Sequence, residues 1–339
     1  MNAREEWLAM RRTGIGGSDI AAIMGLSPWR SAVDVYLDKI GETKDTGENE
    51  AMFWGNVLED VVARHYATKT GAKVQRIGTM MQHPSKPWML GNIDRAIVTP
   101  GSRARFDGGK LLGADGILEC KTAGAFKAAD WGNENDQDAI PTHYAAQCFW
   151  YMGVTGMEWC DIAVLIGGQR YLSKRIERDD EVIRAMEDRA EEFWHRHVLA
   201  RIPPEPTSGS DAVKLFPRDF GTSIIANPKT LELLSRAQEL KQQIEALELE
   251  LDGDRKKGIN GVIGELKAWM GGAAEITLGG QTLATWRAAN DSQKTDWKSV
   301  VDHLRQTYAG EQTFADDLLA AITTNTTTQP GSRRFLIKG

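Results

Sequence analysis

Apolar residues at helical spacing predict three helices near the start of the chain. Ser31 and Asp34 form a capping box, which opens a helix that we expect to run to residue 41. A shorter helix is predicted over residues 18–25, where a serine and an aspartate can cap the first turn, and a third over residues 55–71. The apolar residues of the third helix lie on one stripe, which indicates that one face packs against a core.

Short apolar segments with the character of strands come next. They are predicted over residues 77–82, 88–98 and 116–122. Pro141 suits the first position of a helix that runs to about residue 152. Two further segments, 158–166 and 170–178, are joined by a pair of glycines and predict a hairpin. Helices and strands in this order predict an α/β (α+β) fold, in which helices flank a central mixed sheet.

The clearest break in the chain is a proline cluster at residues 203–206, which follows a long amphipathic helix predicted over residues 179–198. Clustered prolines stop a helix, and the small polar residues after them have the composition of a linker. We therefore predict a main domain over residues 1–205 and a smaller C-terminal α/β extension over residues 206–339.

The predicted extension combines a charged helix with small strand-like elements. Residues 231–251 have apolar positions at helical spacing among many charges, which predicts a solvated or coiled-coil-like helix. Residues 275–287 predict a hairpin around two glycines. Residues 323–332 have a flexible composition, and the chain ends on a basic segment, 333–339, with strand character.

Composition limits the class of protein. Three cysteines, an odd number without close pairing, argue against a disulfide framework and a structural zinc site. We see neither a membrane-spanning apolar segment nor a secretory signal, and so we expect a cytoplasmic protein without a membrane partner. The 41 basic and 47 acidic residues give a net charge of −6, which argues against a protein coated in nucleic acid but not against a locally basic groove.

An acidic and a basic residue interrupt the strand predicted at residues 116–122. Side chains alternate across the faces of a strand, so Glu119 and Lys121 share one face. Leu118 and Cys120 then point to the other face, into a core. Burying a charged pair is costly unless the pair has partners. The pattern therefore predicts either a functional site or an ion pair on an exposed edge strand.

Two further acids can join this pair. Asp94 interrupts another apolar strand, and the glycine-containing segment 99–115 can return the chain as a hairpin that sets Asp94 beside Glu119. Glu59 lies beside the apolar stripe of the third helix and can point inward. Taken singly, Asp94 also fits a turn and Glu59 a solvent-exposed position. Taken together, three carboxylates suit a hard cation such as Mg²⁺ or Mn²⁺.

A divalent ion beside a lysine is typical of a phosphodiester hydrolase. Such an ion polarises the phosphoryl oxygen and activates water. Lys121, held beside the carboxylates, can orient the attacking water and stabilise developing negative charge. The residues therefore predict a metal-assisted hydrolase that uses Glu59, Asp94, Glu119 and Lys121.

The same residues carry a resemblance to a known family. The order Asp94, then Glu119-Cys120-Lys121, is similar to the signature of the PD-(D/E)xK nuclease superfamily. Within it, the chain resembles the YqaJ-type viral recombinases, relatives of the phage lambda exonuclease, in three more segments. These are residues 7–20 (WLAMRRTGIGGSDI), Gly55 to Glu59, and Tyr144 to Gln147. The resemblance covers roughly residues 5–200.

The resemblance implies roles in metal binding and catalysis. Asp94, Glu119 and the main-chain carbonyl of Cys120 would bind the metal. Glu59 would complete the metal site, and Lys121 would be the catalytic lysine.

The resemblance also implies contacts with DNA. Tyr144 and Gln147, three residues apart on one helical face, would flank the reacting strand. Arg11 and Ser18 would grip a terminal 5′ phosphate, Arg11 as a forked donor and Ser18 near the start of a helix. Asn92 falls where the exonuclease relatives have a small polar residue.

The activity implied by the resemblance is that of an exonuclease on linear double-stranded DNA, built on a restriction-endonuclease-like core. It would digest from 5′ to 3′, release 5′ mononucleotides and leave 3′ overhangs for phage-type recombination. A homotrimeric ring that threads duplex DNA is implied as well. So are partnership with a single-strand annealing protein and a place in the cytoplasm of a bacterial host.

Other functions fit the same residues. One is a sequence- or structure-specific endonuclease of the same fold, which would not need a linear duplex. Another is a non-catalytic DNA-binding recombination protein with a relic site, although an intact set of four catalytic residues argues against it. A third is a nucleotidase, which would act on free nucleotides and not on duplex DNA.

Overall fold

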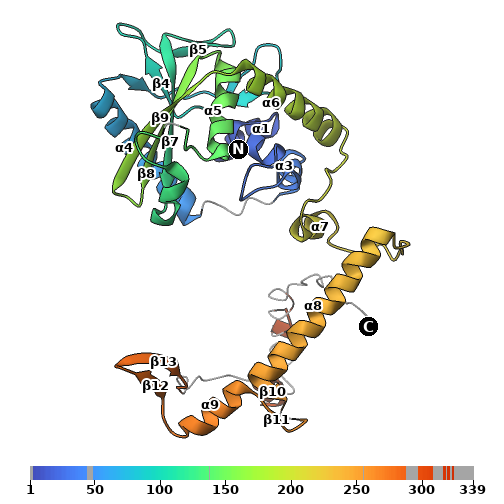
Figure 1. Cartoon of the computed structure of the whole chain (residues 1–339). Helices are drawn as coiled ribbons and strands as arrows, with labels where there is room; N and C mark the ends of the chain where they lie inside the picture. The colour runs from blue at the N-terminus through green and yellow to red at the C-terminus, as the bar shows by residue number, and fades with distance from the viewer. Residues whose placement is uncertain are drawn as a thin grey trace. The chain divides into compact units, whose positions relative to one another are not determined.

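The structure is a computed structural model of the chain (Figure 1). It describes residues 3–43, 49–136, 138–254, 256–287, 297–307, 316–317, 319–320 and 323. By its internal contacts the chain divides into two compact units, Met1–Pro217 and Arg218–Gly339. Within the described part of the chain, no helix combines the length and the apolar character that a membrane span requires.

Four helices precede the main sheet of the first unit. They are α1 (Ala3–Arg12), α2 (Gly17–Ile23), α3 (Ala32–Lys39) and α4 (Glu50–Thr70). The capping box predicted for α3 is confirmed: Ser31 Oγ accepts from Asp34 N at 3.3 Å, and the Asp34 carboxylate accepts from Ser31 N at 3.1 Å. α4 begins earlier than predicted, because Asn49 caps it by accepting a hydrogen bond from Met52 N at 2.9 Å.

The main sheet is mixed and flanked by helices, which confirms the predicted fold class. In order across the sheet, its strands are β1 (Val74–Gln75), β4 (Arg95–Val98), β7 (Ala114–Ala123), β8 (Trp159–Ile166) and β9 (Arg170–Glu177). β7 and β8 are parallel, and the other neighbours are antiparallel, including the predicted hairpin β8–β9. A parallel pair needs a crossover connection, which η1 (Ala125–Trp131) and α5 (Thr142–Thr155) provide.

Two of the predicted strands are interrupted. Segment 77–82 forms only β2 (Met81–Gln82), and segment 88–98 divides into β3 (Leu90–Gly91) and β4. β2 pairs with β3, and β5 (Arg105–Asp107) pairs with β6 (Lys110–Leu112), both outside the main sheet. The break before β4 lies at Asp94, whose carboxylate accepts a hydrogen bond from Cys120 N of β7 at 2.7 Å. The Asp94 side chain therefore bonds to β7 at the position just before β4 begins.

α4 covers one face of the sheet and α5 the other (Figure 1). Leu118 and Cys120 of β7 pack under α4 with Val62 and Tyr66. Ile117 belongs to the larger core on the α5 side. The alternation predicted along β7 is confirmed, and it decides which side chains of this strand face α5.

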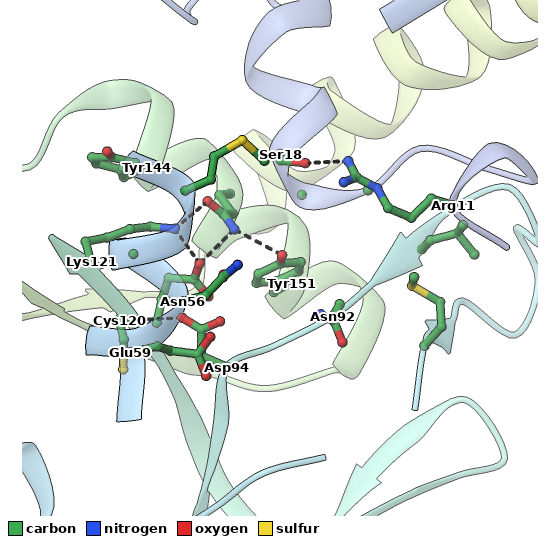
Figure 2. A pocket seen from close by; sticks show the side chains of 18 of the residues that line it. Arg11, Ser18, Asn56, Glu59, Asn92, Asp94, Cys120, Lys121, Tyr144 and Tyr151 are labelled. Carbon is green, nitrogen blue, oxygen red and sulfur yellow. Dashed lines mark hydrogen bonds and ion pairs between the residues drawn. The ribbon is translucent and has the colours of Figure 1, made fainter. Parts of the chain in front are cut away.

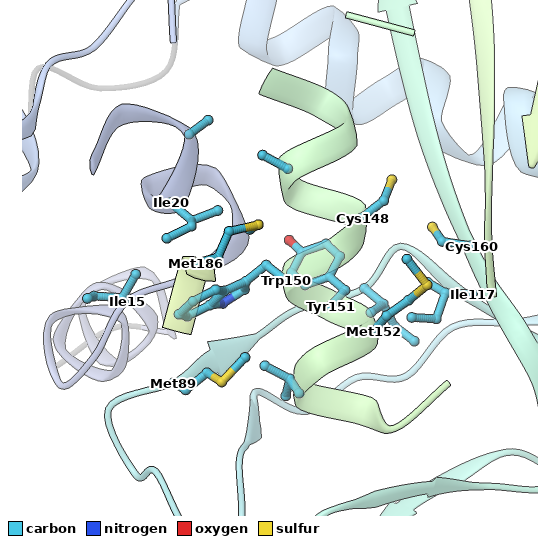
Figure 3. Packing of buried hydrophobic residues seen from close by; sticks show 14 of the residues in the cluster. Ile15, Ile20, Met89, Ile117, Cys148, Trp150, Tyr151, Met152, Cys160 and Met186 are labelled. Atoms are coloured by element: carbon cyan, nitrogen blue, oxygen red, sulfur yellow. The ribbon is translucent and has the colours of Figure 1, made fainter. Parts of the chain in front are cut away.

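α5 runs through the main hydrophobic core of the first unit. In Figure 3, Trp150 extends from α5 towards Ile15 and Met89, whereas Cys148 extends towards Cys160 of β8. Trp150 is 1 % exposed, and its indole N–H donates to the Leu90 carbonyl at 2.9 Å. The polar edge of a large buried ring is thereby satisfied, as buried tryptophans require.

The sequence predicted a domain boundary at residue 205. The first unit runs to Pro217 and includes one further helix after that position. The helix predicted over residues 179–198 forms α6 (Asp180–Glu192), which Asp179 caps, and continues as a π-helix (Phe193–Leu199). α7 (Gly209–Leu215) is bonded to α3: Ser31 Oγ donates to Asp211 at 2.7 Å, and Lys214 lies 2.5 Å from Asp34. These bonds keep α7 with the first unit although the proline cluster precedes it.

The described residues of the second unit include a long helix and two small hairpins. α8 (Pro228–Asp252) includes the predicted charged helix, and β12 (Glu275–Leu278) with β13 (Gln281–Thr285) forms the predicted hairpin. The remaining elements are β10 (Gly253–Asp254), β11 (Ile259–Asn260), α9 (Val262–Met270) and α10 (Trp297–Thr307). The predicted flexible and basic segments near the end of the chain lie outside the described residues, apart from residue 323.

Candidate active site

All ten residues that the sequence selected line one cavity of about 510 Å³ in the first unit (Figure 2). They come from α1, α2, α4, the segment before β4, β7 and α5, which are far apart in the sequence. They are Arg11, Ser18, Glu59, Asn92, Asp94, Glu119, Cys120, Lys121, Tyr144 and Gln147. The fold therefore brings every selected residue to the same place.

The charged pair of β7 faces α5, because the crossover lays this helix over that side of the strand. Lys121 Nζ donates to Glu119 Oε1 at 2.6 Å and to Gln147 Oε1 at 3.0 Å. Gln147 Nε2 donates to Glu119 Oε1 at 2.7 Å and contacts the Tyr151 hydroxyl at 3.0 Å. Glu119 is 1 % exposed, and β7 is the central strand of its sheet. The alternative of an exposed edge-strand ion pair is therefore wrong.

Asp94 lies opposite Glu119 because of the register between β4 and β7. Arg95 pairs with Leu118, so the residue before Arg95 faces the residue after Leu118 in this antiparallel pair. Burial and the neighbouring Glu119 carboxylate raise the pKa of Asp94 well above its ordinary value. The predicted juxtaposition of these two acids thus follows from strand register.

Glu59 reaches the same cavity from α4, but two arginines bind its carboxylate. Oε1 accepts from Arg95 Nη1 at 2.5 Å and from Arg76 Nη2 at 2.9 Å. The Arg95 side chain is 5 % exposed, and it also donates to Asp60 at 3.1 Å and to the Asp94 carbonyl at 2.6 Å. Sequence analysis missed Arg95, since nothing in its spacing distinguishes it from other basic residues.

Two features indicate that a divalent cation fits beside Glu119. Its Oε2 atom is buried and has no hydrogen-bond partner among the residues that the structure describes, while its Oε1 atom accepts from Lys121 and Gln147. Burial raises the pKa of Glu119, against the opposing effect of Lys121, and Asp94 is a second buried acid next to it. Two such carboxylates repel each other unless a positive charge lies between them, and oxygen ligands suit Mg²⁺ or Mn²⁺.

Glu59, the third acid, does not form a preorganised metal site with Asp94 and Glu119. Within the part of the chain that the structure describes, no group of three His, Cys, Asp or Glu side chains is arranged to hold a metal ion. The engagement of Glu59 Oε1 by Arg76 and Arg95 is consistent with this result. The role of Glu59 as a metal ligand stays a prediction.

Lys121 is held as a cation. Burial by itself lowers the pKa of this amine, but the carboxylates of Glu119 and Asp94 raise it, and the net effect is a raised pKa. The Tyr144 ring lies beside the amine, with its centroid 5.0 Å from Nζ, and packs in turn against Trp131. The Lys121 amine therefore carries a positive charge at neutral pH.

Arg11 and Ser18 lie across the cavity from Lys121 (Figure 2). Arg11 Nη2 donates to Ser18 Oγ at 2.9 Å, and the guanidinium lies over the Trp7 ring, 4.9 Å from its centroid. Asn92 lines the cavity from the segment between β3 and β4. A guanidinium, a hydroxyl and an amide are groups that can bind a phosphate.

Sequence analysis did not select several other residues of the cavity. Tyr151 lies one helical turn after Gln147, and this spacing is a signal that could have identified it. Gly17 lets α2 approach α5 closely, since a Cβ atom there would lie 2.5 Å from the Tyr151 ring. Trp7 and Met52 also line the cavity, but only the packing of α1 and α4 reveals this.

Comparison with known sequences links the chain to one family. Residues 6–158 match the sequence profile of the YqaJ-like viral recombinase domain. The chain is 33 % identical to the uncharacterised protein YqaJ of Bacillus subtilis over 312 residues, 90 % of each chain. An uncharacterised protein of Acanthamoeba polyphaga mimivirus, R354, is 26 % identical over 46 % of this chain and 28 % of its own length.

Two exonucleases are among the solved structures to which the chain is similar. An alkaline exonuclease from Laribacter hongkongensis has 22 % identity and a TM-score of 0.44, covering 58 % of this chain and 93 % of that one. A phage-related exonuclease from Haemophilus somnus 129PT has 14 % identity and a TM-score of 0.41, covering 56 % of this chain and 96 % of that one.

Proposed function

Because this chain belongs to the family of YqaJ-like viral recombinases, we propose that it is a metal-dependent deoxyribonuclease acting on linear double-stranded DNA. The proposed activity is that of a 5′-to-3′ exonuclease that releases 5′ mononucleotides and leaves 3′ overhangs for phage-type recombination. One observation carries the proposal. Lys121 and Gln147 bond to one oxygen of Glu119, the other oxygen is buried with no partner in the described part of the chain, and Glu119 lies opposite Asp94.

The proposed ligands of Mg²⁺ or Mn²⁺ are Asp94, Glu119 and the main-chain carbonyl of Cys120, with Glu59 as a predicted fourth. Bound there, the ion would polarise the scissile phosphate and activate water. The protonated Lys121, fixed by hydrogen bonds to Glu119 and Gln147, would stabilise the negative charge that develops on the phosphate oxygens.

The remaining residues of the cavity would position DNA. Gln147 and Tyr144 would flank the reacting strand from the first turns of α5. Arg11 and Ser18, already bonded to each other, would receive a terminal 5′ phosphate, with Asn92 beside them. Tyr144 and Arg11 lie on different sides of the cavity (Figure 2), which suits a strand whose end is held at one side and cut at the other.

Organisation and partners are part of the same proposal. Residues 1–205 would form the exonuclease domain on a restriction-endonuclease-like core, with residues 206–339 as its extension. The family supports a homotrimeric ring, the ends of double-stranded DNA as the substrate, a single-strand annealing protein as partner, and the cytoplasm of a bacterial host. Light scattering after size exclusion tests the ring, which would have three times the chain mass of 37.5 kDa.

Digestion of end-labelled DNA tests the proposed activity. We expect Mg²⁺-dependent loss of linear duplex, faster with a 5′ phosphate, and no cleavage of closed circular DNA. Lys121→Ala should abolish digestion while keeping the fold, which far-UV circular dichroism checks. Lys127→Ala is the matched control, because Lys127 is an exposed lysine that pairs with Asp130 in the segment after β7.

The alternatives give different results in the same assay. Cleavage of circular duplex would indicate an endonuclease, and hydrolysis of free nucleotides alone would indicate a nucleotidase. DNA binding without hydrolysis in any divalent metal would indicate a non-catalytic recombination protein. Unchanged digestion by Lys121→Ala would show that the proposed site is wrong.

A further inference from the structure

A buried carboxylate lies behind the Arg11 side of the cavity. Asp19 is 0 % exposed, and each of its oxygens has two partners. Oδ1 accepts from Arg30 Nη1 at 3.0 Å and from Arg11 Nη2 at 3.4 Å. Oδ2 lies 2.7 Å from Lys39 Nζ and accepts from Gly16 N at 3.0 Å. Arg11 and Gly16 line the cavity, whereas Asp19 does not.

Asp19 is a permanent negative charge at the centre of three cations. Burial acts to raise its pKa, but Lys39, Arg11 and Arg30 lower it, and the net pKa lies well below the ordinary value. Without this charge, the guanidinium groups that share Oδ1 would repel each other. Asp19 therefore allows the guanidinium of Arg30 to lie close to that of Arg11, which lines the cavity.

Lys39 extends the same network to the main chain of Arg11. Its side chain is buried, and Nζ donates to the Arg11 carbonyl at 2.9 Å as well as pairing with Asp19. Arg11 is thus held at its guanidinium by Asp19 and Ser18, and at its carbonyl by Lys39. A long side chain that is ordered before its ligand arrives loses less conformational entropy on binding.

We propose that Asp19 is the positioning residue of the phosphate-binding side of this site. It fixes Arg11 and the start of α2, from Gly16 to Ser18, in the orientation that receives the 5′ phosphate of a DNA end. The inference rests on the function proposed above, in which Arg11 and Ser18 bind that phosphate. It adds a residue that acts through them without touching DNA.

Asp19 also joins α1, α2 and α3, so its role in stability must be separated from its role in positioning. The measured quantity is the ratio of kcat/KM for a duplex with a 5′ phosphate to that for the same duplex with a 5′ hydroxyl. A purely structural residue would change the amount of folded enzyme and leave this ratio unchanged, because both substrates report on the same folded molecules.

For Asp19→Asn we expect the ratio to fall about tenfold towards one, which corresponds to about 1.4 kcal/mol of phosphate recognition. Asp38→Asn is the matched control, since the Asp38 carboxylate pairs with Arg30 at 3.6 Å and with Arg12 at 4.0 Å, and its ion pairs within the described residues do not include Arg11. Its ratio should equal that of the wild type. Fluorescence anisotropy measures DNA binding without turnover when the protein also carries Lys121→Ala. In that background, Asp19→Asn should lose the same preference for the duplex with a 5′ phosphate.

A double substitution separates the two roles further. Asp19→Asn with Lys39→Met removes both partners of the buried ion pair, so no buried charge is left alone, and the melting temperature should recover relative to Asp19→Asn. The preference for the phosphate should stay lost. The inference would be overturned if the double variant regained both its stability and the wild-type kcat/KM ratio. It would also be overturned if Asp19→Asn alone kept the wild-type ratio.

The outcome for the wild type distinguishes this inference from the proposed function. If the wild type digests DNA with no preference for a 5′ phosphate, the assignment of Arg11 and Ser18 is wrong, and the role of Asp19 falls with it. If the wild type shows the preference and Asp19→Asn keeps it in full, only the inference about Asp19 is wrong.

Discussion

Replacing Arg95 with methionine tests whether a buried guanidinium holds α4 to the start of β4. Methionine keeps much of the side-chain length and removes the charge and all the donors. The substitution deletes the bonds to Glu59 at 2.5 Å, to the Asp94 carbonyl at 2.6 Å and to Asp60 at 3.1 Å. It leaves Glu59 with Arg76 as its remaining cation.

The expected cost follows from how deeply each partner is buried. Removing one member of a buried ion pair costs about 3–5 kcal/mol, because the other charge stays behind in a poorly solvated place. Glu59 keeps Arg76, which places the cost near 3 kcal/mol. Asp60 is half-exposed, so its loss adds less than about 1 kcal/mol. For a unit of about 200 residues, a loss of 3 kcal/mol lowers the melting temperature by about 6–12 °C.

Arg76→Met is the matched control. Arg76 donates to the same Glu59 oxygen, at 2.9 Å, but its side chain is 63 % exposed where that of Arg95 is 5 % exposed. An exposed pair contributes less than about 1 kcal/mol, so Arg76→Met should lower the melting temperature by no more than about 4 °C.

Thermal and urea unfolding, followed by tryptophan fluorescence, measure both variants. The buried Trp131 and Trp150 report on the first unit. Equal destabilisation by the two substitutions would refute the reasoning, because burial would then have no influence on the strength of the pair. A loss below about 1 kcal/mol in Arg95→Met would refute it as well, since that is the size of a surface pair.

Three further predictions follow from the structure. Trp150→Ala should destabilise the first unit by about 3–5 kcal/mol in urea unfolding, since it removes a buried ring and leaves the Leu90 carbonyl without its donor, and a loss under 1 kcal/mol would contradict the packing described. Burial raises the pKa of Cys120 and Cys160, so a thiol reagent at pH 8 should label these residues slowly in the native protein and fully in urea, and rapid native labelling would contradict their burial. The pKa of Asp19 is lowered in the fold, so its contribution to stability is present above its ordinary value of 3.8 and is lost as the pH falls towards the lower folded value. The stability difference between the wild type and Asp19→Asn should therefore be largest near neutral pH and shrink below about pH 4, and a difference that stays constant down to pH 3 would contradict this.

The features that the sequence determined are those that depend on neighbouring residues. The Ser31 capping box is complete within four positions, and the alternation of Glu119 and Lys121 with Leu118 and Cys120 follows from strand geometry alone. The approach of Asp94 to Glu119 needed only a hairpin and its register. Three acids and one lysine of the proposed site, Glu59, Asp94, Glu119 and Lys121, could be selected because a charged residue inside an apolar segment departs from the hydrophobic pattern.

Only the tertiary structure decided which partners these charges have. Asp19 reads in the sequence as a cap for a short helix, whereas packing of three helices makes it the buried centre of a cluster with Lys39, Arg11 and Arg30. In the same way, the sequence predicted Glu59 as an inward-pointing acid of the metal site, yet the docking of α4 on the sheet brings Arg95 to it. The physical reason is that ion pairs between distant segments depend on how whole elements dock, and no local periodicity in the chain records that docking.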